Sequence, residues 1–288
     1  MSVSVSLPKI GEGSGGVDED ERLAAVSRTP FLKIIMLNSS KNDWKRFYRE
    51  QYADDWQGFS ETLARQPYHL RYQQALLDRV RGAKPGTLLE VGVGRGDLLI
   101  QFAKEPIELF GCDISSGNLV AARRRFEEVS VPVSLSHADA ERLPFADGAF
   151  DVVYSYSVLW YLPSPSQAAA EMCRVTRPGG TVIFDMLNAL HITSASYHLS
   201  RIIGRCLGKE RGRTRLATPA QLRRWIEPFC NRVEILGNYV VLPAGLPLLG
   251  EKANLFRLVP CWAVTMTESP LPRLFAQKLL AVGTRGPM

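Results

Sequence analysis

The stretch LLEVGVGRGDLL (residues 88–99) sets a short apolar run and one acidic residue, Glu90, directly before glycines at positions 92, 94 and 96. This order predicts a buried strand, a glycine-rich turn and a following helix. Because glycine has no Cβ, backbone N–H groups in such a turn can approach a bound nucleotide closely. The stretch therefore predicts a nucleotide-binding α/β fold, although several nucleotides would fit it.

Strand-like and helix-like segments alternate around this turn, between about residues 86 and 185. The alternation requires crossover connections and predicts a mostly parallel, doubly wound sheet with helices on both faces. Ligands bind such sheets outside the carboxyl ends of the strands, where the strand order reverses. The expected strands are TLLEVG (87–92), IELFGCDI (107–114), VPVSLSHAD (131–139), FDVVYSYS (150–157) and GTVIFDML (180–187), and the expected helices are SGNLVAARRRFEEV (116–129) and SPSQAAAEMCRVTR (164–177).

The N-terminal segments differ in composition from this region. Residues 1–28 are rich in Gly, Ser and acidic residues without an apolar period, which predicts a mobile tail. Residues 29–84 carry aromatic side chains, including Tyr48 and Tyr52, at helical spacing. We expect a helical N-terminal lid over a ligand or, as the alternative, helices that only pack on the core.

Residues 85–288 are expected to form the core, with substrate-side insertions at about 189–217 and 242–270, the first of which follows the fifth strand. The alternation breaks after residue 188, but further regular elements are recognisable. They are a capped helix TPAQLRRWIEPF (218–229, Thr218 as N-cap and Pro219 at N1), a strand RVEILGNYVVLP (232–243) and a final strand FAQKLLAVGTRG (275–286).

Composition narrows the class of protein. The 288 residues include 35 basic and 29 acidic side chains, a net charge of +6, and 45% are hydrophobic, which suffices for a substantial core. The five cysteines are widely spaced without a CxxC pair, so we expect neither a disulfide framework nor a metal site. The longest early apolar stretch, FLKIIML (31–37), is too short to span a bilayer, and we expect a cytoplasmic location.

Residues around the turn discriminate between nucleotides. A Walker A loop requires Lys and then Ser or Thr after its last glycine, whereas Asp97 and Leu98 follow Gly96, which argues against ATP or GTP. The G-x-G-x-G spacing is tighter than the dinucleotide pattern and suits a ligand without a pyrophosphate. The carboxylate of Glu90 would repel phosphates and attract an ammonium group. A ligand with an amino acid moiety is therefore favoured.

Two aspartates end the next two expected strands. Asp113 lies 17 residues after Gly96 and is placed to accept hydrogen bonds from both hydroxyls of a ribose. Asp139 could accept from an adenine amino group while Ala140 leaves its backbone N–H free; the alternative is a turn or helix-cap aspartate. The pair indicates an adenosine-type ligand.

These motifs, E-V-G-V-G-R-G (90–96), the strand end at Asp113, D-A-x-x-L-P-F-x-D-x-x-F-D-V-V (139–153) and R-P-G-G-T-V-I-F (177–184), occur in one order. Together they resemble the motifs of class I S-adenosylmethionine-dependent methyltransferases of the small-molecule, ubiquinone/menaquinone methyltransferase-like kind, over about residues 85–190. The resemblance implies S-adenosylmethionine as cofactor and a seven-stranded Rossmann-like sheet whose antiparallel last strand is FAQKLLAVGTRG. It also implies that the glycine turn holds the amino acid end, Asp113 the ribose and Asp139 the adenine. The expected cofactor site comprises Glu90, Gly92, Gly94, Gly96, Asp113, Ile114, Asp139, Ala140 and Ser155.

The catalytic base expected from this resemblance is missing. Family members often carry a His after the fourth strand, where this chain reads SYSVLWYL (155–162), with Trp160 and Tyr161. Positioning of the reactants and exclusion of water can supply much of the rate enhancement of methyl transfer. An acceptor that is a carbon nucleophile or an acidic hydroxyl would fit the absence of a base. The candidates for a catalytic role are His191 and Tyr161, with His137 and His198 as further histidines.

The acceptor is expected to be a small, fairly apolar metabolite such as a polyketide, isoprenoid or lipid-linked intermediate. The sequence SYSV (155–158) lacks the D/N-P-P-Y/F motif of enzymes that methylate base amines, which disfavours nucleic acid. A basic cluster over residues 201–224 is either a solvated face or a site for phosphates on RNA, a phospholipid surface or a metabolite. The Leu/Pro-rich segment 242–262 is either extra packing on the sheet, a substrate wall or a peripheral membrane contact. The expected acceptor-binding residues are Tyr48, Tyr52, Trp160, Tyr161, Arg201 and Arg205.

Three alternatives to small-molecule O- or C-methylation stay open. The chain could methylate RNA or another phosphate-bearing acceptor, or be a non-catalytic binding module that keeps the nucleotide fold. An NAD-dependent oxidoreductase is the third. No sequence feature indicates an oligomeric state.

Overall fold

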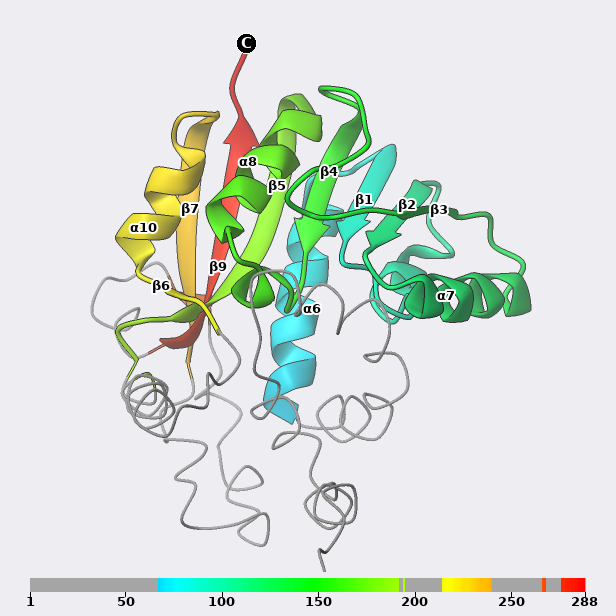
Figure 1. Ribbon diagram of the computed structural model, residues 1–288, viewed down its shortest axis with the longest axis horizontal. Helices are drawn as coiled ribbons and strands as arrows, with labels where there is room; N and C mark the ends of the chain where they lie inside the picture. Colours follow the sequence, from blue (N-terminus) through cyan, green and yellow to red (C-terminus); the bar gives the residue numbers. More distant parts are fainter. Residues whose placement is uncertain (1–66, 192–193, 195–213, 240–265, 268–275, 288) are drawn as a thin grey trace, which may run out of the picture.

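The computed structural model describes residues 67–191, 194, 214–239, 266–267 and 276–287 (Figure 1). The expected strands and helices within these ranges are present with shifts of a few residues at the ends, except the helix expected after the glycine turn. In chain order the elements are α6 (Pro67–Gly82), β1 (Thr87–Val91), the 3₁₀ helix η1 (Leu99–Phe102), β2 (Glu108–Asp113), α7 (Ser116–Glu128), β3 (Ser134–His137), β4 (Phe150–Ser155), the 3₁₀ helix η2 (Leu159–Tyr161), α8 (Pro165–Val175), β5 (Thr176–Asn188), β6 (Leu216–Ala217), α10 (Pro219–Ile226), β7 (Cys230–Tyr239), β8 (Met266–Thr267) and β9 (Ala276–Arg285).

The strands form one mixed sheet in the order β3-β2-β1-β4-β5-β9-β7-β8, and the short β6 pairs with β5 beside this path. Strands β3, β2, β1, β4 and β5 are parallel, whereas β9 is antiparallel to both β5 and β7. Of the nine strands in the described residues, β6 and β8 have two residues each, which leaves seven longer strands. The expected doubly wound, Rossmann-like sheet with an antiparallel last strand is therefore confirmed.

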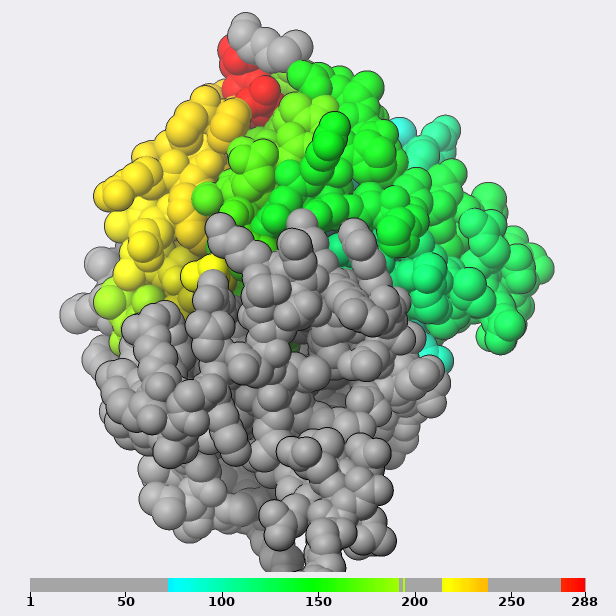
Figure 2. Space-filling view, viewed as in Figure 1, coloured from blue at the N-terminus to red at the C-terminus, as the bar shows by residue number. Residues whose placement is uncertain are grey.

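Successive strand residues contribute to two cores on opposite faces of the sheet. On β1, Leu88 belongs to the core under α6, η1 and α7, and Leu89 to the core under α8 and α10. Val152 and Val153 of β4 divide in the same way, because side chains alternate along a strand. Figure 1 shows α8 and α10 in front of the sheet and α6 behind it, and in Figure 2 the yellow surface of α10 adjoins the green surface over α8. The site is thus carried by a sheet that is buried on both faces.

The helix starts follow the capping residues in the sequence. The Ser115 side chain accepts a hydrogen bond from the Asn118 N–H at the start of α7. Thr218 and Gln221 form a reciprocal capping box before α10, and Pro219 occupies its first turn. The expected N-cap and N1 residues of this helix are confirmed.

The segment after the glycine turn differs from the expected helix. It forms only the four-residue η1, because Pro106 lies shortly beyond it. Proline lacks an N–H group and disfavours helical geometry in the residue before it, so no long helix fits between the turn and β2.

Several expected segments lie outside the described residues. These are the expected tail 1–28, residues 29–66 of the expected lid, most of 189–217 and almost all of 242–270. The described part of the expected lid is α6, which packs Leu76, Leu77 and Val80 into the core.

Cys112, Cys173 and Cys230 are buried free thiols. In the described ranges no helix is long and apolar enough to cross a membrane.

Candidate functional site

The order of the parallel strands reverses between β1 and β4, which makes their carboxyl ends the switch point of the sheet. Glu90 of β1 is in register with Gly111 of β2 and with Tyr154 of β4. The glycine turn follows β1 at this edge, and the segment 156–161 follows β4 beside it. The residues predicted to bind the cofactor are therefore brought to one edge by their strands.

The three glycines of the turn have left-handed backbones, with φ of 77° at Gly92, 53° at Gly94 and 80° at Gly96. A Cβ on Gly92 would lie 2.3 Å from Val158 Cγ2, and one on Gly96 would lie 3.0 Å from Phe126 Cε2. A Cβ on Gly94 would meet nothing within 4 Å among the described residues. Gly92 and Gly96 thus allow the turn to pack on its own chain, whereas Gly94 leaves backbone open to a ligand, which fits a bound nucleoside.

Asp113 ties the end of β2 to this turn. Its Oδ2 accepts a hydrogen bond from the Gly94 N–H at 2.8 Å, and its Oδ1 accepts from the Ser115 N–H at 2.8 Å. Burial raises the pKa of Asp113, and these two backbone hydrogen bonds oppose the rise. Each carboxylate oxygen has a further lone pair, so the group can still accept from a vicinal diol. Ile114 follows it, and the Ile114 carbonyl accepts from His137 Nε2 at 2.8 Å.

Glu90 lies beneath the turn and is only 3% exposed. Its Oε2 accepts a hydrogen bond from the Tyr154 hydroxyl at 2.9 Å, and the Leu99 backbone N–H also bonds to it. Burial raises the pKa of Glu90 to about 8, more than these hydrogen bonds lower it. The carboxyl is therefore mostly neutral at pH 7 without a ligand, so it repels phosphates less than the sequence suggested. An ammonium group nearby would favour its ionised form.

Asp139 lies at the start of the loop between β3 and β4, two residues after the end of β3. Its Oδ1 accepts from the Glu141 N–H at 3.0 Å, and its carbonyl accepts from the Arg142 N–H at 2.9 Å. Asp139 therefore shapes a turn, as in the alternative considered for it, while its other carboxylate lone pairs are compatible with an adenine contact. The next residue, Ala140, is buried. Their contacts with adenine stay predictions.

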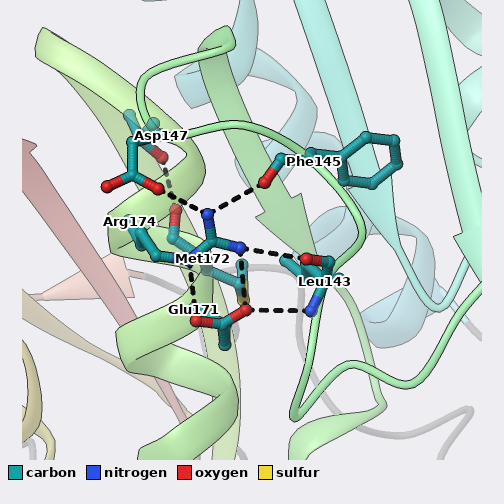
Figure 3. A network of polar contacts seen from close by, with 7 residues as sticks. Leu143, Phe145, Asp147, Glu171, Met172 and Arg174 are labelled. Carbon is teal, nitrogen blue, oxygen red and sulfur yellow. Dashed lines mark hydrogen bonds and ion pairs between the residues drawn. The ribbon is translucent and has the colours of Figure 1, made fainter.

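Arg174 of α8 holds this loop in place (Figure 3). Its guanidinium donates to the carbonyls of Phe145 at 2.9 Å and Leu143 at 3.0 Å, and to Asp147 Oδ1 at 2.6 Å. It also donates to both carboxylate oxygens of Glu171, one of which accepts from the Leu143 N–H at 2.9 Å. Because of the hydrogen bond with Arg174, the pKa of Glu171 is lowered. The loop that presents Asp139 is thus fastened by charge-assisted hydrogen bonds to a helix of the core.

The end of β4 and the segment after it contain three of the predicted site residues, Ser155, Trp160 and Tyr161. The Ser155 hydroxyl is buried and donates to the Val91 carbonyl at 2.7 Å, so it joins β4 to β1. The Trp160 side chain is buried in the core, and Tyr161 beside it is partly exposed. Their expected roles at the cofactor or acceptor stay predictions.

Histidine remains a candidate at one described position. His191 lies three residues after β5 and is buried, and burial lowers its pKa. A lowered pKa keeps its imidazole neutral and able to accept a proton, so His191 stays a candidate base. Tyr48, Tyr52, His198, Arg201 and Arg205 lie outside the described residues.

The structure adds a polar cluster that the sequence did not single out. Lys278 of β9 places its Nζ 3.5 Å from Asp185 Oδ2 of β5 and donates to Ser157 Oγ at 3.1 Å. The same Nζ lies 4.6 Å from the ring centroid of Trp160, 5.0 Å from Tyr156 and 5.1 Å from Tyr72. The sequence signal that could have indicated this cluster is a single charged residue within each of two apolar strand segments, GTVIFDML and FAQKLLAV.

Comparisons with known proteins agree with this geometry. Residues 89–184 match the family model of a methyltransferase domain. The chain is 36% identical over 116 residues to demethylmenaquinone methyltransferase of Beutenbergia cavernae, covering 39% of this chain and 45% of that protein. It is 33% identical over 147 residues to ubiquinone biosynthesis O-methyltransferase of Methylococcus capsulatus, covering 48% and 59% respectively. The chain therefore spans about half the length of the curated relatives it matches.

Solved structures show the same fold. A SAM-dependent methyltransferase of Thermotoga maritima, described as a possible histamine N-methyltransferase, superposes with a TM-score of 0.58 at 18% identity, covering 84% of this chain and 98% of that one. Magnesium protoporphyrin IX methyltransferase of Synechocystis, solved with bound S-adenosylhomocysteine, gives a TM-score of 0.58 at 15% identity, with 85% and 99% covered.

The strand order and the glycine turn at the switch point define a nucleotide-binding, Rossmann-like α/β domain. The match of residues 89–184 to the methyltransferase model and the similarity to the demethylmenaquinone relative identify this part of the chain as a class I S-adenosylmethionine-dependent methyltransferase domain, as its motifs predicted.

Proposed function

We propose that the protein transfers the methyl group of S-adenosylmethionine to an oxygen or carbon atom of a small, fairly apolar acceptor. The observation that carries this proposal is the open backbone at Gly94, whose N–H group bonds to the Asp113 carboxylate at the switch point. A nucleoside there would have its ribose beside Asp113. The named activities of the demethylmenaquinone and ubiquinone relatives support a small-molecule acceptor.

Bound S-adenosylmethionine would supply an electrophilic methyl group on its sulfonium. The residues of the chain then have three tasks, which are to hold the cofactor, to align the acceptor and to exclude water. In this assignment Glu90 supports the amino acid end, Asp113 the ribose and Asp139 the adenine. Alignment of two reactants can lower a barrier by about 7–11 kcal/mol, so this chemistry does not require a nucleophile from the protein.

The class of the acceptor rests on the sequence and on the aromatic residues after β4. Trp160 lies in the hydrophobic core and Tyr161 packs against it, and in this proposal the two side chains form the apolar wall of the acceptor site. The Leu/Pro-rich segment 242–262, from which a polyketide, isoprenoid or lipid-linked acceptor and a membrane contact were expected, lies outside the described residues. We retain this acceptor class as part of the proposal.

The activity can be tested with cofactor carrying a labelled methyl group and an extract of the host, followed by identification of the labelled product by mass. A labelled small apolar compound is the expected result. Label in RNA would support the phosphate-bearing alternative. Cofactor binding without any transfer would support a non-catalytic module.

The cofactor assignment is tested by Asp113→Ala. Loss of two charge-assisted hydrogen bonds to the ribose is expected to weaken binding of S-adenosylhomocysteine by about 2–4 kcal/mol, measured by calorimetry. The control is Asp151→Ala, because Asp151 joins the starts of β1 and β4 through Gly86 and Thr87, at the opposite edge of the sheet. The control should lose thermal stability but keep its affinity. Equal affinity of Asp113→Ala and wild type would remove Asp113 from the site.

A further inference from the structure

The Lys278 cluster lies beside the glycine turn, at the carboxyl ends of the neighbouring strands. Lys278 pairs with Leu187 near the carboxyl end of β5, and its Nζ reaches Ser157, two residues after β4. The next residue, Val158, is the side chain that a Cβ on Gly92 would strike at 2.3 Å. The residue that contacts Lys278 is therefore the direct chain neighbour of the residue that packs on the glycine turn.

The lysine is held rigidly on several sides. Asp185 Oδ1 accepts the Ser157 N–H at 2.7 Å, which helps to keep Ser157 at a left-handed φ of 60°. The aromatic cage, defined as Tyr72, Tyr156 and Trp160, surrounds Nζ with ring faces, an arrangement that stabilises a cation. Ser157 and the cage thus fix where the ammonium group lies.

Two polar atoms are neighbours of the Lys278 ammonium group among the described residues. They are Ser157 Oγ and Asp185 Oδ2, and the buried Asp185 carboxyl also interacts with the Tyr72 hydroxyl. An ammonium group has three donors, so at least one of them is available. Burial lowers the pKa of Lys278 and raises that of Asp185, so a negative charge near Nζ would favour the charged lysine.

The chemistry of the cage discriminates between acceptors. A cage of aromatic rings suits a cationic amine, but here the ammonium of Lys278 already occupies the cage and would repel such a ligand. The side chains of Tyr156, Ser157, Val158 and Lys278 are each partly exposed, so this end of the cluster is accessible among the described residues. A ligand that arrives there meets a positive charge set among apolar rings.

Resting on the proposed function, we propose that Lys278 is the acceptor-binding and specificity-determining residue of this site, and that it binds the ionised oxygen of an acidic hydroxyl on a planar phenol or enol. Asp185 and Ser157 are positioning residues that hold the ammonium group. An acceptor that binds already ionised requires no strong base in the site, which accounts for the missing histidine after β4.

The test compares two matched probes, 2-hydroxy-1,4-naphthoquinone, which is ionised at neutral pH, and its 2-methoxy analogue, which cannot ionise. Each is titrated into full-length protein saturated with S-adenosylhomocysteine. The hydroxy compound should bind wild type about tenfold or more tightly than the methoxy compound, since a hydrogen bond to a charged group has about this value. Lys278→Met should reduce this preference to about twofold or less and leave binding of S-adenosylhomocysteine and of the methoxy compound unchanged.

Controls keep the outcomes separate. Lys104→Met removes an exposed lysine far from this edge and should behave as wild type. Lys278→Arg keeps a positive charge and should keep part of the preference for the hydroxy compound. If Lys278→Met does not fold, Asp185→Asn with Lys278→Met removes both charges together, and the same loss of preference is expected. Wild type that binds S-adenosylhomocysteine but shows no preference, or binds neither probe, overturns this inference alone. Preference retained without Lys278 also overturns it, and failure to bind S-adenosylhomocysteine overturns the proposed function.

Discussion

At the scale of single residues, the candidate site contains a buried carboxyl group, Glu90, whose protonation is set by its surroundings. Glu90 is a carboxyl group buried between the Tyr154 hydroxyl and the Leu99 N–H, beneath the glycine turn that is proposed to hold the cofactor. Burial of this kind is costly for an ionised group unless it is paired. The position therefore links the stability of the protein to its protonation and to its ligand.

Glu90→Gln is expected to separate stability from binding. The pKa of Glu90 is about 8 in the folded protein and 4.5 ordinarily, so its contribution to stability is complete below about pH 4.5 and is lost as the pH rises through 8. At about 1.4 kcal/mol per pKa unit, this loss amounts to at most roughly 5 kcal/mol. Glutamine can still accept from Tyr154 but cannot ionise, so the variant should lack this loss.

Chemical denaturation at about pH 5 and about pH 8.5 measures this difference. The variant is expected to gain stability relative to wild type at the higher pH, while its affinity for S-adenosylhomocysteine falls because no carboxylate is left for the ammonium group. Parallel stability curves for both proteins across this range would show that Glu90 is already ionised in the folded state.

Gly92 and Gly94 should respond differently to the same substitution. Gly92→Ala places a methyl group 2.3 Å from Val158 Cγ2 and should lower the thermal stability strongly. Gly94→Ala meets no described atom, so it should cost only the roughly 1–2 kcal/mol of a left-handed non-glycine residue while blocking the ligand. Thermal unfolding and calorimetry on both variants make the comparison. An unchanged affinity in Gly94→Ala would show that no ligand approaches this backbone.

At the scale of elements, the strand ends position the predicted site residues. The loops between the strands are held in place by hydrogen bonds from helices of the core. The loop between β3 and β4 has little regular structure, yet Arg174 of α8 binds two of its carbonyls and the carboxylate of Asp147 (Figure 3). The expected adenine contact, Asp139, lies in this loop. A helix on one face of the sheet thereby controls a loop at its edge.

Arg174→Met is expected to loosen this loop without unfolding the sheet. Loss of the charge-assisted hydrogen bonds should lower the free energy of unfolding by about 2–4 kcal/mol and speed amide exchange over residues 141–148. Affinity for S-adenosylhomocysteine should fall only a few-fold, because the ribose contact is untouched. Arg223→Met, which breaks an exposed ion pair with Glu227, serves as the control and should change neither quantity. Exchange over this loop as slow as in wild type would show that other contacts hold it.

Predictability from sequence differed between elements for physical reasons. The strands and most helices followed from apolar period and capping residues, because those signals are local. The helix expected after the glycine turn shortened to η1, since Pro106 limits the segment. The cluster of Lys278, Asp185 and Tyr72 was missed, because its members come from β9, β5 and α6 and meet only through sheet order and packing.

At the scale of the whole molecule, the described core is an α/β sheet with the glycine turn at its switch point and the Lys278 cluster on the neighbouring strands. The two regions meet through the segment after β4, where Ser157 contacts Lys278 and Val158 packs on Gly92. In the proposed function this segment places the donor site and the acceptor site in contact, as transfer of a small group requires.

The most direct test of the central claim is a calorimetric titration of the full-length protein with S-adenosylhomocysteine, alongside an identical titration with NAD⁺. The account predicts saturable binding of S-adenosylhomocysteine at one site per chain, weakened in Asp113→Ala, and no binding of NAD⁺. Saturable binding of NAD⁺, or no heat with S-adenosylhomocysteine, would contradict it.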